Sequence, residues 1–249
     1  MSAGIELRQV EFAYPDGTPA LRGTDLSVGP GERVAVLGPN GAGKTTLALH
    51  LNGILVPFAG SISIGGLEVV ESNFPEVRRR VGMVFQDSND QLFMPTVRED
   101  VAFGPANLGW GGDTLEGRVD AALAAVEGTG FADRPPHHLS GGEKRRAALA
   151  TVLAMEPDVL VFDEPSAGLD PAGRRELVAT LRDLPMTQVI ITHDLSLALE
   201  LCPRAVIMNE GRVVADGATR DLLGNGDLLA ANRLELPYGF SLVEATRGD

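Results

Sequence analysis

The sequence predicts an α/β fold in which a mixed sheet is flanked by helices and a helical segment is inserted into the core. Three observations predict it. Residues 33–37 and 159–162 are short apolar runs, typical of strands buried on both faces. The first run leads through a glycine-rich loop into an apolar helix, and the second ends in two acidic residues. Between them, the composition from residue 87 to 138 shifts towards Gly, Pro, Asn and Asp, with helical segments.

The remaining elements follow from periodicity, caps and turns. The expected strands cover residues 5–12, 24–28, 33–37, 61–70, 81–85, 159–162, 188–192, 205–208 and 212–215. A turn at Gly65-Gly66 lies within the fourth of these, and a hairpin around Gly211 joins the last two. The expected helices cover residues 45–51, about 97–103 and 115–127, 140–155, and a segment that starts at Asp170-Pro171. We therefore expect a core with a β subdomain at residues 1–86 and 157–218, a helical subdomain at about 87–156, and a short C-terminal tail at 219–249 that is first helical and then irregular.

The glycine-rich loop has the spacing of a phosphate-binding loop. It runs after a buried strand and opens a helix, and its residues are Gly38, Pro39, Asn40, Gly41, Ala42, Gly43, Lys44, Thr45 and Thr46. The glycines let backbone N–H groups converge on phosphates, and the helix N-terminus adds a favourable dipole. Lys44 is expected at the β- and γ-phosphates, and the Thr45 hydroxyl on Mg²⁺.

The second buried run ends in Asp163 and Glu164, at the edge where open α/β sheets place ligand groups. Asp163 is expected to hold Mg²⁺, directly or through water, and Glu164 to orient and polarise the attacking water. An acidic turn after a strand is common in isolation. Its pairing with the phosphate-binding loop indicates a P-loop NTPase, without deciding the class of NTPase.

A third motif, residues 139–143, precedes a long helix; we call it the signature segment. Ser140 and Glu143 fit a capping box, so the segment could simply cap that helix. In a second interpretation, Ser140, Gly141 and Gly142 present a hydroxyl and free amides to an anion. One chain has little use for two phosphate-binding helix starts on one ATP, whereas the second start makes sense for a nucleotide held by a partner subunit.

In order and spacing these motifs resemble those of the ATP-binding-cassette (ABC) ATPases, and the resemblance covers nearly the whole chain. It implies an antiparallel β subdomain beside the core. It further implies that Gln86 senses Mg²⁺ and the membrane partner, that His193 contacts the γ-phosphate, and that Tyr14 stacks on adenine. Residues 166–170, which end at Asp170, match the segment called the D-loop in that family. Taken singly, Gln86, His193 and Tyr14 have ordinary structural explanations.

The resemblance implies a mechanism as well. Two ATPase subunits, identical or paralogous, would close head to tail around two ATP molecules, each between the phosphate-binding loop of one subunit and residues 140–142 of the other. Hydrolysis would reopen the pair and drive a change in an integral membrane permease. The presence of Glu164 and His193 implies an active site rather than a degenerate one.

Residues 84–105, 139–146 and 232–237 are similar to those of the energy-coupling-factor ATPases, which include cobalt, nickel and biotin uptake types. This resemblance implies a membrane scaffold subunit docked near residues 86–103 and a small substrate-capture membrane protein that selects the cargo. A transition-metal ion or a vitamin would then be the cargo. His137 and His138 adjoin the signature segment but form no convincing metal-ligand set.

Composition limits the kinds of partner and the cellular location that we expect for this protein. The net charge is −13, from 34 acidic and 21 basic residues, which argues against a nucleic-acid partner. The sequence has no long apolar run, no signal peptide and a single cysteine, Cys202, so we expect a peripheral protein on the cytoplasmic face of the membrane.

Several alternatives use some of the same motifs. A conventional ABC importer or exporter would share them all, but residues 85–105 favour the energy-coupling-factor type. A non-transport cassette protein usually has a second cassette, coiled coils or basic arms. A scaffold that binds ATP without turnover would not need Glu164 and His193, and a P-loop small-molecule kinase would give residues 140–142 no role.

Overall fold

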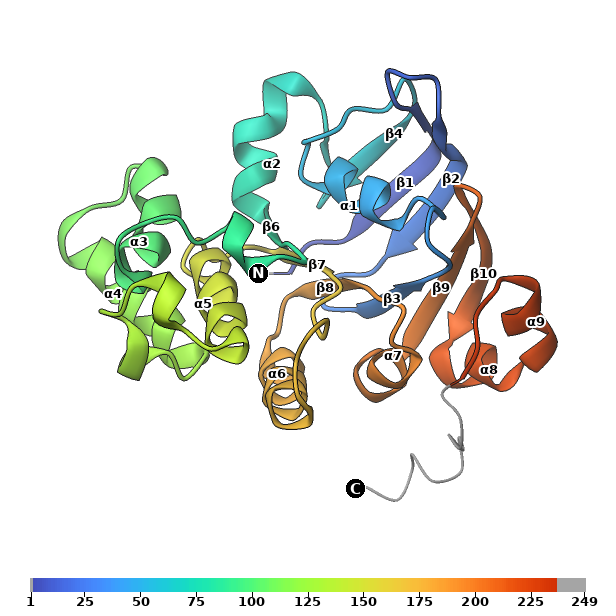
Figure 1. Ribbon diagram of the computed structural model, residues 1–249. Coiled ribbons are helices and arrows are strands. Elements are labelled where there is room, and N and C mark those ends of the chain that lie inside the picture. The colour runs from blue at the N-terminus through green and yellow to red at the C-terminus, as the bar shows by residue number, and fades with distance from the viewer. Residues whose placement is uncertain (1, 237–249) are drawn as a thin grey trace.

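The computed structural model describes residues 2–236 and contains two sheets (Figure 1). The larger sheet, in the order β10-β9-β3-β8-β7-β6, is formed by β3 (Arg33–Leu37), β6 (Val81–Val84), β7 (Val159–Asp163), β8 (Thr187–Ile191), β9 (Arg204–Asn209) and β10 (Arg212–Ala218). The smaller sheet, in the order β2-β1-β4-β5, is formed by β1 (Ile5–Ala13), β2 (Pro19–Val28), β4 (Ala59–Ile64) and β5 (Leu67–Glu68).

The strand directions confirm the predicted fold class. The strands β6, β7, β8, β3 and β9 run parallel, and β10 pairs antiparallel with β9. All pairings in the smaller sheet are antiparallel. The protein is therefore an α/β molecule with a mixed main sheet and a second, antiparallel sheet.

The helices of the described residues are α1 (Lys44–Leu51), α2 (Phe74–Arg80), α3 (Val97–Asn107), α4 (Gly112–Ala125), α5 (Gly141–Leu153), α6 (Pro171–Asp183), α7 (Leu195–Leu201), α8 (Thr219–Gly224) and α9 (Gly226–Ala231). Short 3-10 turns lie at Glu71–Asn73, Ser88–Asp90, Thr129–Phe131 and Pro136–His138. Figure 1 shows α3, α4 and α5 together in one lobe beside the main sheet, and α8 and α9 at its other end. No helix among residues 2–236 is both long and apolar enough to cross a membrane.

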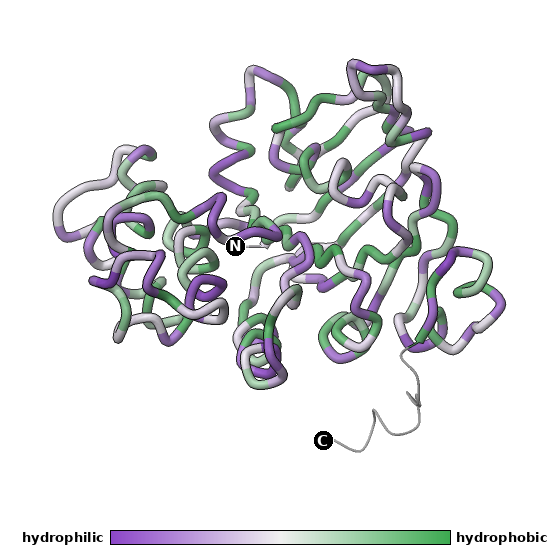
Figure 2. Tube along the Cα trace, viewed as in Figure 1, coloured by the Kyte–Doolittle hydropathy of each residue, from purple (hydrophilic) through white to green (hydrophobic). Residues whose placement is uncertain are grey.

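The two faces of the main sheet belong to different cores, because successive side chains of a strand point to opposite sides. Val34 and Val36 of β3 face a core shared with α1 and the smaller sheet. Ala35 and Leu37 face a second core, shared with α5, α6 and α7. Figure 2 shows hydrophobic segments through the centre of the molecule and hydrophilic ones at its outer turns. Helix α1 is thus held between the two sheets, which fixes the loop before it.

Two helices lie where the sequence analysis expected no element, α2 and α7. Strand β2 is also longer than expected, since it begins at Pro19 rather than near residue 24. The expected strand at residues 61–70 is present as β4 and β5, joined by the turn at Gly65-Gly66. Of the predicted tail, α8 and α9 confirm the helical part, and residues 237–249 lie outside the described residues.

Candidate active site

The glycine-rich loop joins the end of β3 to the start of α1, and its backbone needs glycine at two places. Gly38 has φ 148° and Gly43 has φ 99°, both in the region that disfavours other side chains. A Cβ at Gly38 would lie 2.2 Å from the Met208 carbonyl oxygen, and one at Gly43 would lie 2.4 Å from that of Ala20. No side chain caps α1, so its first amides are available to an anion.

Lys44, the first residue of α1, lies inside the loop that precedes it. Its Nζ donates to the carbonyl oxygens of Gly38 at 2.8 Å and Pro39 at 3.0 Å, and the residue is only 7% exposed. Burial lowers the pKa of Lys44, while the carboxylates of Glu164 and Asp163 act in the opposite direction. The sheet therefore places Asp163, at the end of β7, and Glu164, directly after it, within electrostatic reach of the lysine, although they lie far from it in the sequence.

Thr45 and Asp163, two of the residues that the sequence analysis assigns to Mg²⁺, lie next to each other. The Thr45 hydroxyl hydrogen-bonds the Asp163 carboxylate, which is the last residue of β7 and 7% exposed. Burial raises the pKa of Asp163, and the Thr45 hydrogen bond opposes that shift. A hydroxyl and a carboxylate oxygen side by side form a hard oxygen donor set, which fits Mg²⁺.

Glu164 follows β7 in a left-handed conformation, with φ 49°. Its backbone N–H donates to Ile191 of β8, so the neighbouring strand holds this conformation. Its Oε1 lies 2.8 Å from Nδ1 of His193, and its Oε2 accepts from the Thr192 hydroxyl at 3.1 Å and from the His193 amide at 3.3 Å. The two residues predicted to act on the attacking water and the γ-phosphate are thus in direct contact.

Tyr14 lies beside the start of α1. Its hydroxyl and the Thr46 hydroxyl are 2.9 Å apart, and its ring packs edge-on against Phe12. The Phe12 ring in turn packs edge-on against His50, which is fully buried. The Tyr14 side chain is therefore oriented by Thr46 at its hydroxyl and by Phe12 at its ring. The residue is still 37% exposed, so its ring can stack on a flat ligand.

His50 predicts a pH dependence of stability. Its Nδ1 lies 2.7 Å from the Thr46 carbonyl oxygen, and its buried Nε2 has no partner among the described residues. Burial lowers the pKa of His50 below its ordinary 6.5, so the unfolded chain takes up a proton before the folded protein does. As pH falls below 6.5, the free energy of unfolding should fall by up to about 1.4 kcal/mol per pH unit.

Urea denaturation between pH 7.5 and pH 5 measures this slope. His50→Leu, which removes the titrating group and keeps an apolar side chain, should flatten it. His137→Gln changes an exposed histidine and should keep the wild-type slope. An unchanged slope in His50→Leu would assign the pH dependence to other groups.

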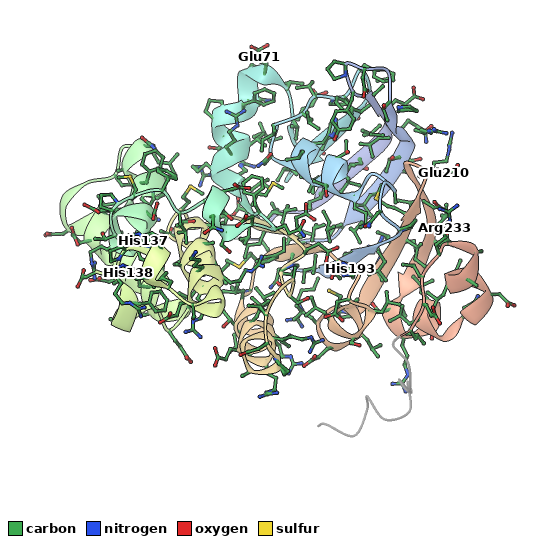
Figure 3. All side chains as sticks on the ribbon, viewed as in Figure 1. Glu71, His137, His138, His193, Glu210 and Arg233 are labelled. Carbon is green, nitrogen blue, oxygen red and sulfur yellow. The ribbon has the colours of Figure 1, made fainter. Side chains whose placement is uncertain are left out.

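A pocket of about 350 Å³ opens beside the glycine-rich loop and His193. Its lining combines residues from three parts of the chain: Gly38, Pro39, Asn40, His193, Leu195, Arg233, Leu234 and Glu235. Two of these lining residues, His193 and Arg233, are labelled in Figure 3. The sequence analysis assigned no ligand-binding role to residues 233–235, because the only signal there was the resemblance of residues 232–237, of which Pro237 lies outside the described residues.

The signature segment lies apart from the glycine-rich loop, at the start of α5 in the helical lobe (Figure 1). The predicted capping box is present: the Ser140 hydroxyl accepts from the Glu143 amide at 3.2 Å, and Glu143 accepts from the Ser140 amide at 2.7 Å. Arg134 also pairs with Glu143 at 2.8 Å. Ser140 and Gly141 are exposed, and a Cβ at Gly141 or Gly142 would meet no neighbour within 4 Å. This helix start therefore faces open space.

The two other predicted residues lie after β6 and at the start of α6. Gln86 follows β6 and its side chain is exposed, while its carbonyl oxygen accepts a hydrogen bond from Arg145 at 3.0 Å. Asp170 caps α6 by accepting from the Gly173 amide at 2.7 Å, so its carboxylate already has a structural role. Arg145 has no distinguishing signal in the sequence, because it is one arginine in a basic run at the start of a helix.

Comparisons with known proteins identify the group to which this site belongs. Residues 21–167 match the family described as ABC transporter, which is more than half of the chain. The chain belongs to the ABC transporter family. As an ABC ATPase it binds ATP, and its hydrolysis of ATP is coupled to transport.

Three known proteins are similar to this chain over most of its length. A Streptomyces coelicolor protein described as an ABC transporter ATP-binding protein is 61% identical over 96% of this chain and 92% of its own length. The energy-coupling factor transporter ATP-binding protein EcfA of Methanothermobacter thermautotrophicus is 46% identical over 98% of this chain and 80% of its own. The structure of cbiO1 from Clostridium perfringens, part of the ABC transporter complex cbiONQ, has a TM-score of 0.82 and 38% identity, covering 94% of this chain and 95% of its own.

Proposed function

We propose that this ABC ATPase powers an importer of the energy-coupling-factor type, as a dimer that closes head to tail around two ATP molecules. The second subunit is another copy of this chain or a paralogue. The contact between Glu164 Oε1 and His193 Nδ1 at 2.8 Å, beside the buried Lys44, carries the proposal of turnover. The Glu164 carboxylate, proposed to act on the attacking water, thus lies next to the His193 imidazole, proposed to contact the γ-phosphate.

Two separate helix starts support the dimer. No side chain caps the amides at the start of α1 beside Lys44, and the Gly141 and Gly142 backbone at the start of α5 faces open space next to Ser140. Each start suits an anion. Because they lie in different lobes, one ATP held at Lys44 needs the α5 start of a second subunit to enclose its γ-phosphate.

The residues then have distinct roles in hydrolysis. The amides of the loop and Lys44 bind the phosphates, and Tyr14 stacks on the adenine. Glu164 accepts a proton from the attacking water, while His193 orients the γ-phosphate. Thr45, Asp163 and Gln86 would hold Mg²⁺, which supplies charge neutralisation at the β- and γ-phosphates when bound.

The importer type is supported by the similarity to EcfA and to cbiO1. In the structure, Phe93 and Phe103 are 61% and 44% exposed, and their rings meet edge to face at 5.0 Å. We expect this aromatic pair, in the segment that follows Gln86, to receive a helix of the membrane scaffold subunit at the cytoplasmic face. A small capture protein on that scaffold would select the cargo, a transition-metal ion such as cobalt or nickel, or a vitamin.

Purification from gently solubilised membranes tests this proposal. We expect the protein to bring down one scaffold membrane subunit and a small membrane capture protein, whose bound ligand names the cargo. Phe93→Asp with Phe103→Asp should lower that recovery by roughly tenfold or more, as expected when central aromatic anchors are lost. Phe58→Asp is a matched control, because Phe58 is 67% exposed on the loop before β4. Recovery of a conventional permease with a separate solute-binding protein would contradict the energy-coupling-factor type.

A further inference from the structure

Arg145 is a buried cation in the helical lobe. It lies in the second turn of α5 and is 7% exposed, and within residues 2–236 it forms no ion pair with a carboxylate. A buried guanidinium has five N–H donors that must be satisfied. Its partners are backbone carbonyl oxygens, which indicates that it holds loops rather than another side chain.

The guanidinium joins two loops that are far apart in the sequence. Its Nη1 donates to the carbonyl oxygens of Gln86 at 3.0 Å and Phe85 at 3.4 Å, directly after β6. Its Nη2 donates to the carbonyl oxygen of Ala167 at 2.9 Å. Because the two nitrogens of the fork point at different loops, one side chain sets the spacing between them.

The Ala167 loop is connected directly to Glu164. The Ala167 amide donates to the Glu164 carbonyl oxygen at 3.1 Å, so a shift of the loop moves the backbone of Glu164. Helix α5 also carries Ser140 at its N-cap. Arg145 therefore links three features of the proposed site: the Gln86 loop, the loop after Glu164, and the helix that presents Ser140.

We propose that Arg145 is a positioning residue, which holds Gln86 and Glu164 in register with the signature segment so that an enclosed ATP is hydrolysed. The inference rests on the proposed function and deepens it, because it names a residue that sets the rate of turnover without touching the nucleotide. Within residues 2–236, its hydrogen bonds go to the carbonyl oxygens of Phe85, Gln86 and Ala167 and not to the loop before α1.

Other long side chains lack the geometry of this link. A lysine ammonium can donate to one of the two loops, but it is a point charge without a planar fork and does not span both. A glutamine has one amide nitrogen, and its oxygen would face a carbonyl. Lysine should therefore keep part of the link, whereas glutamine should lose most of it.

The test compares Arg145→Gln and Arg145→Lys by phosphate release, binding of a fluorescent ATP analogue and thermal unfolding. We expect Arg145→Gln to lower kcat by roughly tenfold to a hundredfold, the size expected for misplaced reacting groups. The KM and the affinity for the analogue should stay within about twofold, since the phosphate-binding loop is unchanged. Arg145→Lys should give an intermediate kcat, which a purely structural role would not produce at equal stability.

Lys144→Gln is the matched control. It removes a cation from the same helix, where Lys144 Nζ donates to the Asn89 side chain at 2.9 Å, and leaves the three carbonyl contacts of Arg145 in place. Wild-type kcat in a folded Arg145→Lys or Arg145→Gln protein would overturn the inference. A loss of kcat that only follows a loss of thermal stability or of ATP affinity would overturn it as well. If wild-type protein neither hydrolyses ATP nor dimerises with it, the proposed function fails instead.

Discussion

Replacing Glu164 with glutamine is expected to lower the kcat of ATP hydrolysis by about a hundredfold to ten-thousandfold, the usual effect of removing a general base. The amide keeps the size of the side chain and can still accept from the Thr192 hydroxyl and the His193 amide, which now contact Glu164 Oε2. ATP should therefore still bind. With binding kept and turnover lost, an ATP-bound dimer should accumulate, as measured by phosphate release and by light scattering after gel filtration with Mg²⁺ and ATP.

Glu127→Gln is the control for this change. Glu127 is exposed and has φ 53°, so this variant replaces a glutamate by glutamine in the same left-handed conformation, but away from the site. It should turn over ATP at the wild-type rate and form no trapped dimer. Normal hydrolysis by Glu164→Gln would remove Glu164 from the role of general base, and a slow variant without an ATP-bound dimer would contradict the closed arrangement.

Ser140→Arg is the second change with a large expected effect. Ser140 is exposed at the start of α5, so an arginine fits there in the isolated subunit but fills the space that a partner's ATP needs. We expect hydrolysis to fall by roughly a hundredfold or more, as when donors to a developing charge are removed. Binding of ATP to the isolated subunit should be unchanged, since Lys44 and its loop are intact. Phosphate release and binding of a fluorescent ATP analogue measure the two effects.

Loss of the helix cap alone costs about 1 kcal/mol, so it needs its own control. Thr96→Arg supplies one, because Thr96 and Glu99 form the same capping box at the start of α3. That variant should lose similar stability and keep hydrolysis. Intact activity in Ser140→Arg would contradict an ATP site that is shared between two subunits.

Local signals account for the elements that the sequence predicted correctly. The capping box at Ser140 and the Asp170-Pro171 helix start each lie within a few residues, so both can be recognised without the fold. The buried runs that became β3 and β7 are apolar on both faces. A resemblance to known ABC ATPases supplied the roles of Gln86, His193 and Tyr14, which no local pattern carries.

The two missed helices have weak local signals. Helix α2 is short, and three arginines end it. Helix α7 reads LSLALEL, where apolar residues largely alternate as in a strand. It is helical because Asp194 caps it and because Leu195, Leu197, Ala198 and Leu201 all bury against the core under the main sheet. Such burial is a property of the folded chain.

The sequence by itself determined the fold class, the phosphate-binding loop, the acidic end of β7 and the cap of the signature helix, because each depends on neighbouring residues. Only the tertiary structure decided that Lys44 lies within reach of Asp163 and Glu164, that Glu164 contacts His193, and that Arg145 joins the Gln86 and Ala167 loops. Those contacts depend on which strands are neighbours in the sheet and on how the helical lobe packs against it. Pairings between residues far apart in the sequence are set by the burial of whole elements, and a local sequence pattern does not encode them.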